Sequence, residues 1–262
     1  MPRVSIVIPV FNTETLFLEE AVASALRQTY PDIEIVIVDD GSTREETLGL
    51  LEELRKKDSI QVVRQSNSGP SAARNTGIAA ATGEYILPLD ADDVIEPTYV
   101  QQAYEAMEKN PKLGLVYCRA DYIGAWSGPW ELPDYSYPEI LLGNCIFCTA
   151  LFRKSDWEKV GGYKTVMRLG WEDYEFFLSL IERGLGVYCI PQVLFHYRKH
   201  GPSRTTNTES NENMEILWSD IRRYHRCLFF KNYHFLHKRH SGLYETWKRL
   251  SFLGKCRELF RL

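Results

Sequence analysis

Hydrophobic residues in the first half of the chain occur in short runs that alternate with segments of helical spacing. Five runs rich in branched aliphatic residues are predicted to be strands, at residues 4–11, 33–39, 60–64, 84–90 and 113–118. Strands buried on both faces form such runs, and intervening helices connect parallel strands. The pattern therefore predicts an α/β fold with a mainly parallel sheet covered by helices on both faces.

Several segments carry the signals of helix starts. Ser42 and Glu45 have the spacing of a capping box, and Pro97 suits the first position of a later helix. Residues 172–183 repeat apolar side chains at helical spacing and predict another helix. Beyond residue 120 the alternation gives way to Trp, Gly, Pro and Tyr, which predicts irregular structure over an active-site face.

Polar residues follow three of the predicted strands. Asn12 follows the first strand, the run 39–42 (Asp-Asp-Gly-Ser) follows the second, and the run 90–93 (Asp-Ala-Asp-Asp) follows the fourth. In open α/β sheets the ligand crevice lies outside the carboxyl ends of the strands. These three polar segments are therefore expected to converge on one site.

The acids at 90–93 favour a metal over a purely structural role. Capping of the next helix explains Ser42 better than Asp40, and three carboxylates within four residues repel one another unless a cation or solvent screens them. An Asp-x-Asp pair supplies hard oxygen ligands for Mg²⁺ or Mn²⁺, which are usually held by one or two carboxylates and substrate phosphates. The pattern thus predicts a phosphorylated ligand.

Two common nucleotide-binding motifs are missing from the sequence. No G-x-G-x-x-G follows the first strand, and no G-x-x-x-x-G-K-[ST] occurs. Their absence argues against dinucleotide oxidoreductases and P-loop NTPases. A sugar nucleotide, whose diphosphate bridges a divalent metal, is then the favoured ligand.

Composition indicates a globular protein with a sizeable core. The 262 residues are 44% hydrophobic and 25% charged, which fits neither a disordered nor a fibrous chain. No apolar run approaches the roughly 20 residues of a membrane span and no export pattern is seen, so a cytoplasmic location is expected.

Cys145 and Cys148 form a lone C-x-x-C without partners for zinc, so reduced, packed thiols are expected.

The charge is divided unevenly along the chain. The net charge is −4, yet residues 218–262 carry 11 Lys and Arg against three acids, which leaves a surplus of 12 acids before them. Residues 218–262 therefore predict an appended basic, aromatic helical tail with a partner of its own. Nucleic acid is disfavoured as that partner, because the acidic remainder of the chain would be repelled.

The tail contains one apolar stripe at helical spacing, with most of its basic residues off the stripe. The stripe consists of Trp218, Ile221, His225, Leu228, Phe229 and Leu236. An interfacial helix on an anionic membrane has this character, which predicts peripheral contact with the inner face of the membrane. Packing against the catalytic domain, or a homodimer seam, accounts for the stripe nearly as well.

Six short motifs, in this order, resemble family 2 glycosyltransferases of the GT-A fold. They are Ile8-Pro9-Val10-Phe11-Asn12, Val38-Asp39-Asp40-Gly41-Ser42, the stretch from Asn67 and Gly69 to Ala73-Arg74-Asn75-x-Gly77, Leu89-Asp90-Ala91-Asp92-Asp93, Gly161-Gly162-Tyr163 and Trp171-Glu172-Asp173-Tyr174.

The resemblance covers roughly residues 1–205. It implies a Rossmann-like GT-A domain with a nucleotide-binding half (1–118) and an acceptor-binding half (119–205), followed by a lid or linker at 206–217. It also implies transfer of a sugar from a nucleotide diphosphate donor, with inversion at the anomeric carbon and with Mn²⁺ or Mg²⁺ as cofactor.

The same resemblance implies roles for individual residues. Phe11 would stack on the nucleobase, Asp39 would accept a hydrogen bond from it, and Arg74 would close the nucleotide pocket. The full nucleotide-binding set would be Pro9, Phe11, Asn12, Asp39, Asn67, Arg74, Asp90 and Ala91. For Phe11 and Arg74, a strand aromatic and a solvated helix residue are the structural alternatives.

Metal and diphosphate contacts are also implied. Asp92 would ligate the metal directly, with Asp93 behind it and His200 as a further ligand. Arg198, in a flexible loop, would contact the diphosphate.

Asp173 is similar to the family's catalytic base, and Glu172 would position the acceptor. General-base help of this kind is typically worth about 10² to 10⁴ in rate. The structural alternative is that both acids complement the positive end of a helix dipole, which would lower the pKa of Asp173 and weaken it as a base. Burial beneath Trp171, or a bound acceptor, would raise that pKa.

The expected function is an inverting glycosyltransferase in bacterial-type cell-surface polysaccharide or glycolipid assembly. Its partners would be a nucleotide-sugar donor, with a UDP-sugar favoured, and a glycan or lipid-linked acceptor. A sugar nucleotidyltransferase is an alternative, although residues 9–13 lack the glycine-rich, lysine-bearing loop of that class. A nucleotide-sugar-binding protein with a degenerate site is another.

Overall fold

The computed structural model describes residues 2–200 and 211–239, and four of the five predicted strands lie in its first sheet, while the one predicted at 113–118 belongs to a second sheet. The strand order of the first sheet is β3-β2-β1-β4-β8. The strands are β1 (Val4–Val10), β2 (Ile33–Asp39), β3 (Ile60–Arg64), β4 (Tyr85–Pro88) and β8 (Phe152–Arg153). The first four pair in parallel, and β8 adds an antiparallel edge. The predicted α/β fold is confirmed.

A second sheet holds the remaining strands in the order β5-β9-β6-β7. They are β5 (Val94–Ile95), β6 (Leu113–Gly124), β7 (Gly128–Trp130) and β9 (Gly186–Lys199). β6 passes without a break through the predicted boundary at 118, so the two predicted halves share a strand. Residues 195–199, expected in a flexible loop, are the end of β9; that expectation was wrong.

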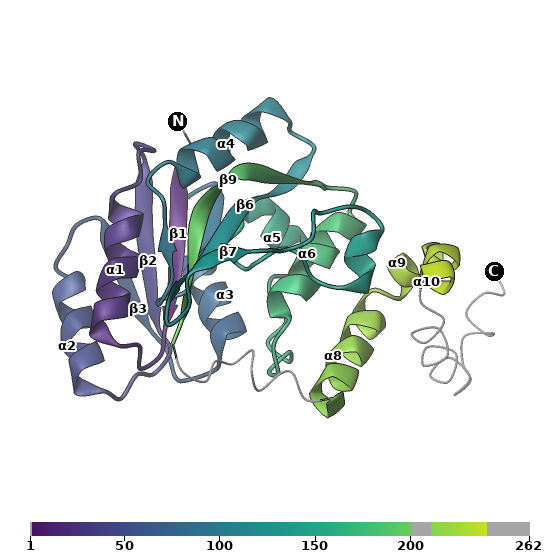
Figure 1. Ribbon diagram of the computed structural model, residues 1–262. Helices are drawn as coiled ribbons and strands as arrows, with labels where there is room; N and C mark the ends of the chain where they lie inside the picture. The colour runs from purple at the N-terminus through teal and green to yellow at the C-terminus, as the bar shows by residue number, and fades with distance from the viewer. Residues whose placement is uncertain (1, 201–210, 240–262) are drawn as a thin grey trace.

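Helices cover both faces of the first sheet (Figure 1). The helices before residue 200 are α1 (Thr15–Leu26), α2 (Glu45–Leu54), α3 (Pro70–Ala80), α4 (Tyr99–Lys109), α5 (Lys154–Val160) and α6 (Glu172–Glu182), with a 3₁₀ turn at Glu139–Leu142. α3 packs on β1 and β2, while α4 packs on β6 of the second sheet. The predicted helix at 172–183 is therefore confirmed.

α3 approaches the sheet closely because it carries a glycine at the contact. A Cβ atom on Gly77 would lie 2.4 Å from Val7 Cγ1 and 2.9 Å from Val38 Cγ2. The helix begins with Pro70 at its first turn, where proline is tolerated. This packing fixes the position of Arg74, one turn before Gly77, near the carboxyl ends of the strands.

The predicted capping box was wrong, because α2 has no side-chain cap and Asn12 holds the segment before it. α2 begins at Glu45, and Asn12 Oδ1 accepts the backbone N–H groups of Thr43 at 2.7 Å and Arg44 at 3.0 Å. Ser42 Oγ accepts the N–H of Asn12 at 3.0 Å instead. Asn12 thereby ties the end of β1 to the start of α2. Pro97 also precedes its helix, since α4 begins at Tyr99.

Three helices form the described part of the tail: α8 (Asn211–Tyr224), α9 (Arg226–Lys231) and α10 (Tyr233–Arg239). α8 begins inside the predicted linker 206–217, so residues 211–217 are helical and that part of the linker prediction was wrong. Residues 206–210 of the linker and 240–262 of the tail lie outside the described residues. Within the described ranges, no helix is both long and apolar enough to cross a bilayer.

The apolar stripe of the tail faces the catalytic domain. Ile221, His225, Leu228 and Phe229 are buried, and Trp218 and Leu236 pack against the core. The described stripe is therefore not free to insert into a membrane, and the expectation of membrane contact through it was wrong. Packing against the catalytic domain is the alternative that the structure shows.

Replacing Ile221 by alanine should measure this packing. Ile221 is fully buried, whereas Ile216 on the same helix is 44% exposed. We expect Ile221→Ala to lower the free energy of unfolding by about 2 to 5 kcal/mol, because a buried cavity is created. The matched control Ile216→Ala should change it by less than about 0.5 kcal/mol. Urea unfolding of both variants would check this, and equal small effects would show that the stripe is not packed.

Candidate active site

One large cavity lies at the carboxyl ends of β1, β2 and β4 and reaches the second sheet. Its volume is about 1050 Å³. Twelve of the thirteen predicted site residues line it: Pro9, Phe11, Asn12, Asn67, Arg74, Asp90, Ala91, Asp92, Glu172, Asp173, Arg198 and His200. The fold thus brings together motifs that are up to 191 residues apart in the chain, as the strand-end argument predicts.

Asp39 is the exception, because its side chain does not line the cavity. Its predicted contact with the nucleobase was therefore wrong. The side chain turns away from the cavity and is only 3% exposed. It accepts hydrogen bonds from the Ser42 N–H at 2.8 Å and from Arg64 Nη1 at 2.7 Å. The next residue, Asp40, lines the cavity instead. Side chains alternate along an extended strand, so a shift of one residue exchanges an inward for an outward carboxylate.

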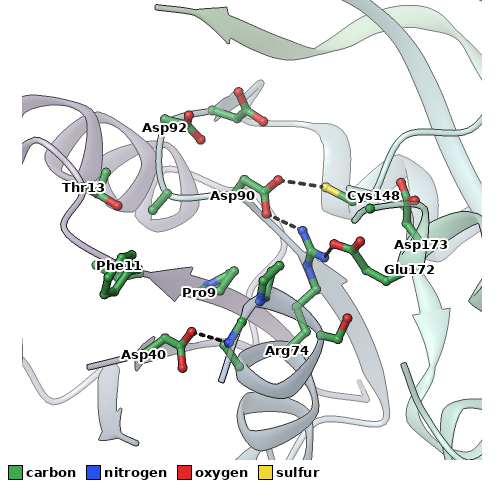
Figure 2. A pocket seen from close by; sticks show the side chains of 18 of the residues that line it. Pro9, Phe11, Thr13, Asp40, Arg74, Asp90, Asp92, Cys148, Glu172 and Asp173 are labelled. Atoms are coloured by element: carbon green, nitrogen blue, oxygen red, sulfur yellow. Dashed lines mark hydrogen bonds and ion pairs between the residues drawn. The ribbon is translucent and has the colours of Figure 1, made fainter. Parts of the chain in front are cut away.

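Asp40 and Phe11 lie at one end of the row of side chains in Figure 2, and Glu172 and Asp173 lie at the other. Asp40 accepts the backbone N–H groups of Ser68 and Gly69, both at 2.8 Å. The Phe11 side chain is half exposed and open to the cavity, so its ring is free to stack. This end therefore suits a planar, hydrogen-bonding group.

Arg74 lies between Asp90 and Glu172, between the two ends (Figure 2). Its Nη2 donates to Asp90 Oδ1 at 2.7 Å and its Nη1 to Glu172 Oε1 at 2.8 Å. Burial disfavours the charged guanidinium, but the carboxylates outweigh it and raise the pKa of Arg74 well above its ordinary value. Cys148 Sγ adds a donor to Asp90 at 3.4 Å. The predicted solvated-helix alternative for Arg74 is therefore wrong.

Asp173 stands at the start of α6 with its carboxylate facing the cavity. Burial, and then the charge of Glu172, raise the pKa of Asp173 to about 7, although Arg74 and the Tyr174 N–H act in the opposite direction. The helix dipole, which would lower this pKa, is therefore outweighed. A carboxylate with a pKa near neutrality can accept a proton at physiological pH.

The turn before Asp173 is strained and is held by the tail. Trp171 has φ 59°, which is unfavourable for a bulky residue. Its ring packs edge-on against Trp218 of α8 and Tyr174 of α6, at 5.0 and 5.7 Å between ring centroids. The tail helices therefore support the turn that presents Asp173.

Asp92 and His200, the two predicted metal ligands, lie together. Asp92 Oδ2 and His200 Nε2 are 2.7 Å apart, and burial together with the charge of Asp90 raises the pKa of Asp92. No group of three His, Cys, Asp or Glu side chains able to hold a metal is found among the described residues. Two protein ligands, one a hard oxygen donor, fit Mg²⁺ or Mn²⁺ that takes its other ligands from substrate phosphates and water.

Arg198 lines the cavity and is also anchored to neighbouring groups. Its Nε donates to the Asp92 carbonyl at 2.7 Å, and its guanidinium also pairs with Glu20 and lies over the Phe17 ring. Its backbone N–H donates to Asp93 Oδ1 at 2.8 Å. Arg198 therefore positions the Asp90–Asp93 loop, and its contact with the diphosphate stays a prediction.

Sequence reasoning missed several lining residues, among them Asp40, Cys148 and Tyr197. Asp40 carries a signal, since it lies inside the recognised motif that contains Asp39. The other two come from the irregular stretch and from β9, where no motif marks them. Their place in the cavity depends on strand pairing in the second sheet.

Comparison with known proteins assigns the family of this chain. A family model described as "Glycosyl transferase family 2" matches residues 5–168, more than half of the chain. The chain therefore belongs to glycosyl transferase family 2. The match ends before Glu172 and Asp173, so the base assignment depends on the structure.

Curated relatives agree with this assignment. An uncharacterized glycosyltransferase of Rickettsia typhi is 33% identical over 233 residues, covering 83% of this chain and 71% of that protein. The uncharacterized glycosyltransferase EpsJ of Bacillus subtilis is 44% identical over 119 residues, which are 45% of this chain and 34% of EpsJ. Chondroitin synthase of Escherichia coli is 31% identical over 74% of this chain and 29% of its own length.

Solved structures show the same fold. Residues 1–349 of TarS from S. aureus, in complex with UDP-GlcNAc, superpose with a TM-score of 0.69 at 20% identity. The similarity covers 85% of this chain and 66% of that one. The GT-A expectation is thereby confirmed.

Removing the buried guanidinium of Arg74 should destabilise the protein strongly. Arg74→Met would leave Asp90 and Glu172 without their buried partner, and we expect a loss of about 3 to 5 kcal/mol in unfolding free energy. Arg55→Met breaks an exposed ion pair with Glu52 and should cost less than about 1 kcal/mol. Chemical denaturation would compare them, and similar effects would contradict a central role for Arg74.

Proposed function

We propose that this glycosyltransferase moves a sugar from a UDP-sugar to a hydroxyl of a growing cell-surface glycan or glycolipid, with inversion and with a divalent metal. The name of the E. coli relative, chondroitin synthase, and that of a Myxococcus xanthus relative, an O-antigen biosynthesis protein, support the acceptor class. Related folds were solved with UDP and with UDP-GlcNAc, which supports the donor class.

One observation carries this proposal: a carboxylate with a raised pKa and an Asp–His pair line the same cavity. Asp173 lines one part of the cavity, and the Asp92–His200 pair lines another. The ion pair of Arg74 with Asp90 also lines the cavity. An inverting displacement needs a base on the face of the sugar opposite the leaving diphosphate. Asp92 and Asp173 lie at different places around the cavity in Figure 2, which supports this arrangement.

The proposed reaction uses the chain's own residues as follows. Asp173 accepts the proton of the acceptor hydroxyl while the hydroxyl oxygen bonds to the anomeric carbon of the donor sugar. The bond between that carbon and the diphosphate oxygen breaks, and its electron pair leaves with the diphosphate. Arg74 keeps Asp90 and Glu172 in place, and Phe11 and Asp40 bind the nucleobase.

Asp92 and His200 would hold the divalent metal in the proposed enzyme. When bound, the metal neutralises charge on the departing nucleoside diphosphate. The sugar nucleotidyltransferase alternative does not fit the family assignment. A binding protein without activity differs from the proposed enzyme in whether donor is consumed, which the assays below measure.

Transfer should depend on the ionisation of Asp173. With a pKa of about 7, the base is protonated and inactive at lower pH, so kcat should rise with pH and level off above neutrality. Asp173→Asn should lose transfer by about 10² to 10⁴ while still binding UDP. Glu172→Gln removes the neighbouring charge and should move the rising limb to lower pH. A flat profile, or a fully active Asp173→Asn, would contradict this assignment.

The dependence of UDP-sugar hydrolysis on a divalent metal should require the Asp92 carboxylate. We expect slow hydrolysis of the UDP-sugar by wild type with Mn²⁺, lost on chelation and restored by Mn²⁺. Asp92→Asn should abolish it or raise the Mn²⁺ requirement by about 10-fold or more, because a charged ligand is lost. The matched control Asp58→Asn, at an exposed position, should behave as wild type. Hydrolysis that is insensitive to chelation would contradict a metal at this site.

A further inference from the structure

The second sheet presents a row of aromatic side chains on one of its faces. In the register of β6 and β9, Tyr122 is opposite Tyr197, and Gly124 is opposite Lys199. β7 adds Trp130 opposite Ala120. Because side chains alternate along strands, residues two apart share a face. We call Tyr122, Trp126, Trp130 and Tyr197 the aromatic wall.

The rings of the aromatic wall contact one another closely. Trp130 stacks on Tyr197 with ring centroids 4.9 Å apart and on Tyr122 at 5.5 Å, both at an interplanar angle of 29°. Trp126 packs edge-on against Tyr122 at 6.1 Å. Such contacts hold the rings in place, so the wall is a preformed surface.

Lys199 adds a positive charge to this surface. Its Nζ lies 4.8 Å from the ring centre of Tyr197, 5.5 Å from that of Tyr122 and 6.0 Å from that of Trp126. No carboxylate among residues 2–200 and 211–239 lies within ion-pairing distance of it. Cation–π contacts position the ammonium at a modest gain of about 0.5 to 1 kcal/mol each when exposed. The Lys199 ammonium is therefore held beside these rings without a carboxylate partner among the described residues.

The wall belongs to the cavity of the proposed enzyme and continues beyond it. Trp130 and Tyr197 line the cavity together with Asp173. Trp126 is 64% exposed, so the surface extends toward solvent. The nucleobase end, marked by Phe11 and Asp40, is formed by the first sheet instead. A ligand on the wall would therefore approach Asp173 from the side away from the nucleotide.

We propose that the aromatic wall and Lys199 form an acceptor subsite for an anionic saccharide. The apolar face of a pyranose ring stacks on the wall, and a carboxylate or phosphate group of the same chain pairs with the Lys199 ammonium. This inference rests on the proposed function, since it assigns the acceptor side of that cavity. The extension past the cavity favours a chain of several sugars over a monosaccharide.

Three saccharides of equal length would test the subsite: cellotetraose, its C6-carboxylate derivative and its C6-phosphate derivative. Their affinities would be measured by calorimetry on the full chain with UDP and Mn²⁺. We expect wild type to bind one or both anionic forms up to about fivefold more tightly than the neutral form, which is the upper range for an exposed ion pair. The tighter of the two identifies the source of the anionic group.

Variants separate the charge from the stacking surface. Lys199→Met should abolish the preference for anionic forms and retain binding of cellotetraose, which also shows that the variant is folded. Trp130→Leu should weaken all three ligands. Lys57→Met, at an exposed position, is the matched control and should change nothing. In wild type, raising NaCl from about 0.05 to 0.5 M should reduce the preference through screening.

Equal binding of neutral and anionic forms by wild type, no binding of any form, or a preference that survives in Lys199→Met would overturn the proposal. Hydrolysis of the UDP-sugar by wild type reports separately on the proposed function. A wild type that hydrolyses donor without a charge preference contradicts the subsite alone. One that prefers anionic saccharides but never consumes donor contradicts the proposed function.

Discussion

The structure depends on the buried guanidinium of Arg74, which is held between the carboxylates of Asp90 and Glu172. Arg74 lies on a helix that packs directly on the first sheet, Asp90 lies in a loop at the end of β4, and Glu172 begins α6. A charge removed from water is tolerated only when it is paired and hydrogen-bonded. The guanidinium therefore fixes the distance between the loop that carries Asp92 and the helix that carries Asp173, and thus relates the predicted metal ligand to the predicted base.

The same pair explains how two neighbouring acids differ in their chemistry. Glu172 faces Arg74 and pairs with it, whereas Asp173 faces the cavity beside that negative charge and has a raised pKa. Trp171 holds the turn before them in an unfavourable conformation, and packing by Trp218 of the tail stabilises that turn. The tail helices are in this way part of the architecture of the site, although none of their residues lines the cavity among the described side chains.

Errors in the sequence analysis have identifiable physical causes. The strands were predictable because buried parallel strands require runs of aliphatic residues, and the motifs located the cavity. Asp39 was exchanged for Asp40 because the direction of a side chain depends on backbone geometry at the end of β2. The capping box at α2 was predicted wrongly because Ser42 Oγ accepts the N–H of Asn12, a residue distant in sequence, and α2 has no side-chain cap. The tail stripe resembled a membrane helix because a buried interface and a lipid surface require the same apolar spacing.

By itself, the sequence determined the fold class, the family and most of the residues that meet at the cavity, since these follow from local periodicity and from short motifs. Only the tertiary structure decided which acid faces the ligand, how Arg74 links Asp90 to Glu172, and where the second sheet places Trp130 and Lys199. Those features arise from contacts between segments far apart in the chain. Pairing, burial and pKa depend on three-dimensional neighbours, which no local pattern specifies.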